Sequence, residues 1–116
     1  MKLASYNVKG FHNTAKVRAL WQWLYTNDID VLCVQEHNKH ECGGQLAHHQ
    51  GYTSFYGGSM QFSGTLIIVR DQLSPTLAFN HALGCLLGVN IITDDGPLLI
   101  TNVYGPHASV PRSELW

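Results

Sequence analysis

The chain has 116 residues and a formal net charge of −1 at pH 7, which predicts one modest domain and excludes an overall basic footprint for nucleic acid. Hydrophobic residues make up 45% of the chain and charged residues 13%. Soluble domains usually carry about 25% charged residues, so we expect some of this surface to be covered by a partner.

Several features of the sequence predict an intracellular protein, cytoplasmic or nuclear, that is not secreted and has no membrane partner. No apolar run approaches the ~18 residues needed to span a bilayer. Polar residues interrupt the N-terminal segment, so it lacks a secretory apolar region. The three cysteines, an odd and sparse set, are Cys33, Cys42 and Cys85. Such a set indicates a reducing compartment without a disulfide framework.

The first part of the chain predicts a strand, a helix and a second strand. Residues 2–8 form the first strand, which Lys9-Gly10 ends. A helix begins after Asn13 or Thr14 and runs to about residue 26. Its apolar stripe, at the spacing i, i+3, i+4, i+7, is Val17, Leu20, Trp21 and Leu24. Residues 29–36 are mostly apolar and predict a buried strand, and a strand-helix-strand unit makes the two strands parallel.

The rest of the chain predicts further strands. Residues 37–50 are polar, with one helical turn expected at 45–49. Strands are expected at 52–56, 65–70, 86–93 and 97–104, with breaks at 57–58, 63–64 and 74–75. Asp94-Asp95-Gly96 predicts a hairpin between the last two strands. On the final strand Leu98, Ile100, Asn102 and Tyr104 share a face.

Polar side chains lie at three strand ends: Asn7, Glu36 and Tyr104. Parallel neighbouring strands open their carboxyl ends onto one crevice, where α/β sheets bind ligands. Glu36 follows an apolar strand, and a carboxylate there is costly unless it meets a cation or a proton. An amide, a carboxylate and a phenol suit Mg²⁺ and a phosphate. Alternatively, Glu36 is a surface acid, Asn7 forms a turn at the strand end, and Tyr104 is an amphipathic rim residue.

Four segments in this order resemble motifs of the endonuclease/exonuclease/phosphatase superfamily. Residues 5–10 (Ser-Tyr-Asn-Val-Lys-Gly) resemble its Ser-Trp-Asn-Val-x-Gly opening. Residues 30–36 are similar to its Asp-(apolar)-Gln-Glu motif, and residues 63–69 to its Ser-Gly-Val-(apolar) strand. Residues 101–107 resemble Asn-(apolar)-Tyr-Ala-Pro-Asn. The Tyr-x-Pro pattern is typical of apurinic endonucleases and of the endonuclease domains of LINE-type retrotransposons.

The resemblance implies an α/β fold: a mixed sheet with outer helices, corresponding to about half of a four-layer α/β/β/α sandwich. Residues 1–116 would be the N-terminal half of the domain, because the later Asp-x-Asn motif and the terminal Asp-His pair are absent from the sequence. This half would supply essentially one sheet. Its inner face would be uncovered and would favour self-association. That face includes Leu32, Val34, Leu98 and Ile100.

The resemblance also implies site residues and an activity. Glu36 would be the ligand of Mg²⁺ or Mn²⁺, Asn7 would belong to the active-site network, and Tyr104 would contact the scissile phosphate. Asn7, Tyr104 and His107 would bind substrate, although His107 stands where the family has asparagine and is alternatively a rim histidine. Gly84-Cys85 stands where members of this family often have Gly-Arg. The implied activity is endonuclease-type phosphodiester hydrolysis of DNA, or alternatively RNA, impaired or absent without the later motifs.

Three rival hypotheses remain open from the sequence. The chain could be a non-catalytic half-domain that self-associates or binds nucleic acid weakly. It could be a metal-binding module, although its His-x₂-His-x-Cys spacing is not a common zinc pattern. That module would use His37, His40, Cys42, His48 and His49. Finally, the same superfamily chemistry could act on a phosphoinositide, a sphingolipid or an RNA tail.

Overall fold

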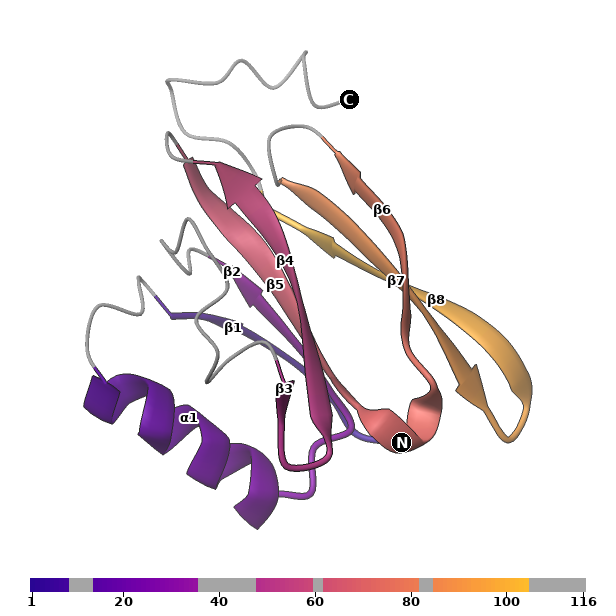
Figure 1. The fold of residues 1–116 in the computed structure, drawn as a ribbon, viewed down its shortest axis with the longest axis horizontal. Coiled ribbons are helices and arrows are strands. Elements are labelled where there is room, and N and C mark those ends of the chain that lie inside the picture. Colours follow the sequence, from indigo (N-terminus) through magenta and orange to yellow (C-terminus); the bar gives the residue numbers. More distant parts are fainter. Residues whose placement is uncertain (9–13, 36–47, 60–61, 82–84, 105–116) are drawn as a thin grey trace.

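The computed structural model describes residues 1–8, 14–35, 48–59, 62–81 and 85–104, and Figure 1 shows them as one helix and two stacked sheets. The elements in chain order are β1 (Leu3–Asn7), α1 (Thr14–Thr26), β2 (Val31–Gln35), β3 (His48–His49), β4 (Tyr52–Ser59), β5 (Phe62–Arg70), the 3₁₀ turn η1 (Asp71–Leu73), β6 (Thr76–His81), β7 (Leu86–Thr93) and β8 (Gly96–Val103). The first sheet has the order β1-β2-β5-β4-β3, and the second has β6-β7-β8. The α/β class predicted from the sequence is confirmed.

Helix α1 covers the outer face of the first sheet, and its predicted apolar stripe is buried. Val17, Leu20, Trp21 and Leu24 are at most 7% exposed. They pack against one face of β2 and β5. The helix ends at Thr26, and the turn that follows contains a left-handed Asp28, with φ of 53°. Strands β1 and β2 are parallel, as predicted. Within the described residues, no helix is long and apolar enough to cross a lipid bilayer.

A second core lies between the two sheets, and it corrects the prediction of a single sheet with an uncovered inner face. The first sheet contributes Val31, Cys33, Ile67 and Val69, and the second contributes Leu87, Val89, Ile91 and Ile100. The odd-numbered residues of β2 therefore face the second sheet, because side chains alternate along a strand.

The residues predicted to line an open inner face lie in three different environments. Leu32 and Val34 are on the opposite face of β2, buried beneath α1. Ile100 is 7% exposed between the sheets, whereas Leu98, nearer the hairpin turn, is 43% exposed. The prediction was wrong because β6, β7 and β8 form a sheet of their own. That sheet packs on the first sheet and does not extend it.

Three local predictions also need correction. Strand β4 continues through the expected break at Gly57-Gly58, and β5 begins at Phe62, before Ser63-Gly64. An irregular register between Gly57 and Ser59 accommodates these glycines within the pair of strands. His48 and His49 form strand β3 and no helical turn.

Strand β6 was not predicted. All six of its residues are exposed, so its sequence shows no alternation of buried apolar and exposed polar residues. The strand forms by pairing with β7. The hairpin of β7 and β8 around Asp94-Asp95 agrees with the sequence.

A charged cluster holds together the beginnings of β1 and β2 and the end of β5. Arg70 Nε donates to Asp30 Oδ1 at 2.9 Å, and Arg70 Nη2 donates to Asp28 Oδ1 at 2.8 Å. The guanidinium carbon lies 5.1 Å from the centre of the Tyr52 ring. Asp30 Oδ2 also accepts the backbone N–H of Lys2 at 2.8 Å. This cluster fixes the end of the first sheet at which β1 and β2 begin.

Cys33 in the inter-sheet core is expected to be inert toward alkylating reagents at pH 8. Burial raises the pKa of its thiol from the ordinary value of 9.0 to about 11, and the thiolate is the reactive form. Iodoacetamide treatment followed by peptide mass spectrometry should find Cys33 unmodified in native protein and modified in denaturant.

The same thiol should make stability depend on pH at the alkaline end. Its folded-state pKa is raised, so its contribution is complete below about pH 9 and is lost as the pH rises toward about 11. A Cys33→Ala variant should lack this dependence. Rapid labelling of native Cys33 at pH 8 would contradict the burial of this thiol.

Candidate functional site

The polar ends of β1 and β2 lie side by side. Asn7 is the registered partner of Gln35 across the parallel pair. The Asn7 side chain is exposed, and Gln35 is half-buried. Glu36 follows Gln35 directly in the sequence but lies outside the described residues, as does His107. The structure therefore places Asn7 beside the residue that precedes the predicted metal ligand.

A pair of amides joins this end of the first sheet to strand β8. Gln35 Nε2 donates to Asn102 Oδ1 at 2.8 Å and to Ser5 Oγ at 3.1 Å. Asn102 is 2% exposed. Its Nδ2 group donates to the carbonyl oxygens of Val34 at 2.9 Å and Leu66 at 3.0 Å. Both N–H donors of Asn102 are thus satisfied, as a buried amide requires.

The alternation of β2 and β5 explains how Asn102 reaches the backbone of the first sheet. Val34 and Leu66 are registered partners, and their side chains pack on the α1 side. On the opposite face of the sheet, the side chains of Val34 and Leu66 therefore do not cover their own backbone. Asn102 can approach the two carbonyl groups from that face. Burying an amide without hydrogen bonds is costly, so these bonds fix how β8 lies on the first sheet.

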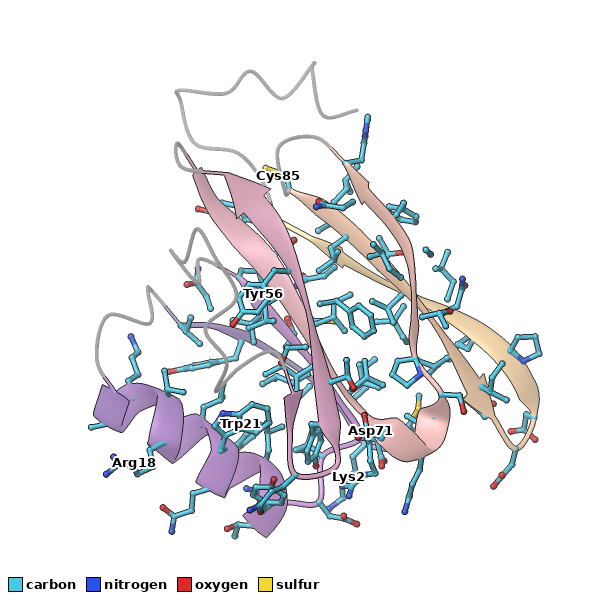
Figure 2. All side chains as sticks on the ribbon, viewed as in Figure 1. Lys2, Arg18, Trp21, Tyr56, Asp71 and Cys85 are labelled. Atoms are coloured by element: carbon cyan, nitrogen blue, oxygen red, sulfur yellow. The ribbon has the colours of Figure 1, made fainter. Side chains whose placement is uncertain are left out.

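Tyr104 follows β8 at the same end of the sandwich. Its backbone N–H donates to the carbonyl of Cys85 at 2.9 Å, and its side chain is half-buried. In Figure 2 Cys85 lies at one end of the molecule, while Lys2 and Asp71 lie at the other. Because Gln35 is bonded to Asn102, two residues before Tyr104, the ends of β1, β2 and β8 gather at one end of the structure. The predicted chemical roles of Asn7, Glu36 and Tyr104 stay predictions.

Among the described residues, no group of three or more histidine, cysteine or acidic side chains is placed to hold a metal ion. Asp28, Asp30 and Asp71 belong to the opposite end, where Arg70 lies. Glu36 is the acid that the sequence places next to Gln35. One carboxylate, together with waters and phosphate oxygens, is a common way for proteins to hold Mg²⁺, so the residue types fit this ion.

The rival metal module stays a hypothesis, because the structure describes the backbone of only two of its five residues. His48 and His49 form β3, at the opposite edge of the first sheet from β1. His37, His40 and Cys42 lie outside the described residues.

Sequence reasoning missed Gln35 and Asn102 as a structural pair. A signal was available, since Asn102 shares a face with Leu98 and Ile100 and that parity predicts a buried amide. A buried amide needs partners, and Gln35 at the end of an apolar strand is a suitable one. Only the packing of the two sheets shows that these amides meet.

The two stacked sheets, with α1 on the outer face of the first, define a mixed α/β protein. A model of the Endonuclease/Exonuclease/phosphatase family matches residues 4–116, and the chain belongs to this family.

Solved structures of nucleases share the fold. An AP endonuclease from Archaeoglobus fulgidus aligns with a TM-score of 0.71 at 24% identity, covering 91% of this chain and 41% of the other. AP endonuclease LMAP from Leishmania major aligns with a TM-score of 0.69 at 18% identity, covering 96% and 42%. The 3'-5' exonuclease NExo from Neisseria meningitidis aligns with a TM-score of 0.66 at 18% identity, covering 99% and 46%. The chain thus spans less than half the length of these structures, and the likeness is one of fold.

Proposed function

We propose that this chain takes part in magnesium-dependent, endonuclease-type hydrolysis of phosphodiesters in nucleic acid. The observation that carries the proposal is the Gln35–Asn102 hydrogen bond of 2.8 Å, which gathers the ends of β1, β2 and β8. These strand ends carry Asn7 and Tyr104 and precede Glu36. Membership of the family supports the reaction class, and the nuclease names of the structural neighbours support nucleic acid as the substrate.

Each residue at these strand ends has a proposed role. Glu36 would hold Mg²⁺ or Mn²⁺, which when bound polarises a phosphoryl oxygen. Asn7 would orient a phosphate oxygen or a water through its amide without adding charge. The Tyr104 hydroxyl would donate to a phosphoryl oxygen as negative charge develops on it. His107 would contact the substrate beside this group.

We further propose that hydrolysis by the chain alone is impaired or absent. Residues 1–116 would correspond to the N-terminal half of the family's domain, of the apurinic-endonuclease or LINE-type retrotransposon branch, acting inside the cell. The sequence contains no Asp-x-Asn motif and no Asp-His pair that could activate water. Acid-base assistance typically contributes about 10²–10⁴-fold to rate, so its loss has a large effect.

A second candidate function is non-catalytic: a half-domain that self-associates or binds nucleic acid weakly. Large apolar side chains exposed along β1 and β8 favour it, among them Leu3 at 56%, Tyr6 at 54% and Leu99 at 49% exposure. Magnesium distinguishes the two candidates, because only the hydrolytic site needs the ion at Glu36.

The test is the effect of Mg²⁺ on binding to a fluorescent DNA duplex, measured by anisotropy. We expect Mg²⁺ to tighten binding about tenfold, or about 1.4 kcal/mol, and a Glu36→Gln variant to lose this effect. Asp94→Asn, in the exposed turn between β7 and β8, is the matched control and should keep it. Nicking of supercoiled plasmid by the same proteins reports any hydrolysis.

The results separate the candidates. Nicking that disappears in Glu36→Gln would establish hydrolysis and remove the non-catalytic alternative. Equal Mg²⁺ effects in the wild type and in Glu36→Gln would remove Glu36 from the proposed site. Binding that is unaffected by Mg²⁺, without nicking, would favour the non-catalytic half-domain.

A further inference from the structure

Gln35, the last residue of β2, is hydrogen-bonded to the ends of both β1 and β8. Its Nε2 group donates to Ser5 Oγ on β1 at 3.1 Å and to Asn102 Oδ1 on β8 at 2.8 Å. Its backbone carbonyl accepts from the N–H of Val8, directly after β1, at 3.1 Å. One residue therefore connects three strand ends at the candidate site.

The same bonds fix β1 on both sides of Asn7. Ser5 lies two residues before Asn7 on the same face of β1, because side chains alternate along a strand. Val8 follows Asn7 directly. Both Ser5 and Val8 are bonded to Gln35, and Asn7 is the registered partner of Gln35. Contacts with Gln35 consequently set the position of Asn7 relative to β2.

The backbone determines the direction of the amide network. Both N–H groups of Asn102 donate to main-chain carbonyl oxygens, so its Oδ1 atom faces Gln35 as an acceptor. Only a donor can complete this contact, and Gln35 therefore turns its Nε2 group toward Asn102. The second N–H of that group reaches Ser5. The network thus gives the Gln35 amide one orientation, in which both of its donors are used.

The core between the sheets becomes polar at this end. Gln35 and Thr65 are registered partners, whereas the next pair on the same face is Cys33 and Ile67. In the described part of the chain, Thr65 and Asn102 are the buried polar residues. Burying amides is costly, and apolar side chains would fill the same space without that cost. A satisfied polar network makes a core more rigid, which suits a part of the core that holds strand ends in place.

We propose that Gln35 is a positioning residue of the candidate site and holds Asn7 and Glu36 in place for a divalent cation. Glu36 follows Gln35 directly in the sequence, so fixing the end of β2 also fixes the start of the segment that carries Glu36. This inference rests on the proposed function, in which Glu36 is the metal ligand. Residues that support a ligand without touching the ion typically contribute about 10–100-fold to metal affinity.

Binding of Mn²⁺ to the 116-residue chain, measured by electron paramagnetic resonance, tests this role. Gln35→Met keeps a long unbranched side chain and removes its two hydrogen bonds. We expect the dissociation constant for Mn²⁺ to rise at least about tenfold in this variant.

The matched control is Thr93→Val, at the far end of the β7–β8 hairpin. The Thr93 hydroxyl also makes two hydrogen bonds, because it donates to the Gly96 carbonyl at 2.8 Å and accepts from Asp95 N at 3.2 Å. Thr93→Val should therefore lower stability by an amount similar to Gln35→Met, as measured by chemical denaturation. Its affinity for Mn²⁺ should equal that of the wild type.

A spectroscopic readout separates positioning from a loss of stability. Mn²⁺ is paramagnetic, and in the wild type it should broaden the side-chain amide NMR signals of Gln35 and Asn7. The signal of Gln72 should stay sharp, because Gln72 follows Asp71 in η1 at the opposite end of the molecule (Figure 2). Glu36→Gln should abolish the broadening, whereas Thr93→Val should preserve it.

A second variant keeps the test decisive if Gln35→Met fails to fold. Ser5→Ala removes the bond to Gln35 at an exposed position and should still weaken Mn²⁺ binding relative to Thr93→Val. Wild-type affinity in the folded variants at positions 5 and 35, or an equal loss in Thr93→Val, would overturn this inference. The proposed function would survive that result if Glu36→Gln alone lost Mn²⁺. A wild type that binds no Mn²⁺, or binds it as Glu36→Gln does, would overturn the proposed function and this inference with it.

Discussion

Replacing Asn102 with aspartate is expected to lower the free energy of unfolding by about 3–5 kcal/mol, the usual cost of an uncompensated buried charge. In the native structure the Nδ2 group of Asn102 donates to the carbonyls of Val34 and Leu66 at 2.9 and 3.0 Å. A carboxylate would place an acceptor against two acceptors in a side chain that is 2% exposed. Domains are stable by roughly 5–15 kcal/mol, so the loss is a large share of the total.

Chemical denaturation of Asn102→Asp at pH 7 and pH 4 measures this effect. Burial raises the pKa of the introduced carboxyl, so its protonated form is favoured in the folded state. The loss in free energy of unfolding relative to the wild type should therefore shrink as the pH falls toward about 4. Asn90→Asp, an exposed position on β7, is the control and should change stability by less than about 0.5 kcal/mol. Equal losses in the two variants would contradict the proposed inter-sheet role of Asn102.

Replacing Trp21 with alanine is expected to cost about 3–5 kcal/mol, as large-to-small changes of buried tryptophan do. Trp21 is 4% exposed and lies between α1 and the first sheet, with its ring centre 5.8 Å from that of Tyr52. Figure 2 shows its side chain directed from the helix toward the strands. The lost packing would loosen the attachment of α1 to the sheet.

Trp23, two residues further along the same helix, provides the control. It is 42% exposed, so Trp23→Ala should cost less than about 1 kcal/mol. Both variants are best unfolded in guanidinium at one low protein concentration, so that self-association does not contribute. A larger loss in Trp23→Ala than in Trp21→Ala would contradict the orientation of the helix.

Local periodicity predicted the elements that bury one continuous stripe or one apolar run. The spacing of Val17, Leu20, Trp21 and Leu24 identified α1 and its buried face, because a helix repeats every 3.6 residues. The run from Val31 to Val34 identified β2, but it is apolar on both faces. It therefore contains no information about which face meets α1 and which meets the second sheet.

Long-range pairing determined the features that the sequence could not show. Every residue of β6 is exposed, so its place follows from its register with β7 and not from its own pattern. The glycines at 57–58 suggested a break, yet β4 continues through them because β5 supplies a partner strand. In both cases tertiary context overrides local propensity.

In the candidate site, too, some features follow from the local sequence and others only from long-range packing. Polar residues at strand ends drew attention to Asn7, Glu36 and Tyr104 without any knowledge of the packing. The contact between Gln35 and Asn102 joins positions 67 residues apart, and one sequence contains no record of such a contact. The sequence therefore suggests these residues as candidates, whereas it could not show the bonds that gather the ends of β1, β2 and β8.

The distance along the chain between Gln35 and Asn102 has a consequence for how the protein is made. All five strands of the first sheet lie within residues 3–70, so that sheet and its helix can form while the remainder is still being synthesised. The polar end of the sandwich can form only after Asn102 has left the ribosome, because contacts between distant positions form only after the intervening loop closes. Until then Gln35 lacks its partner on β8, and the nascent chain presents apolar strands to chaperones.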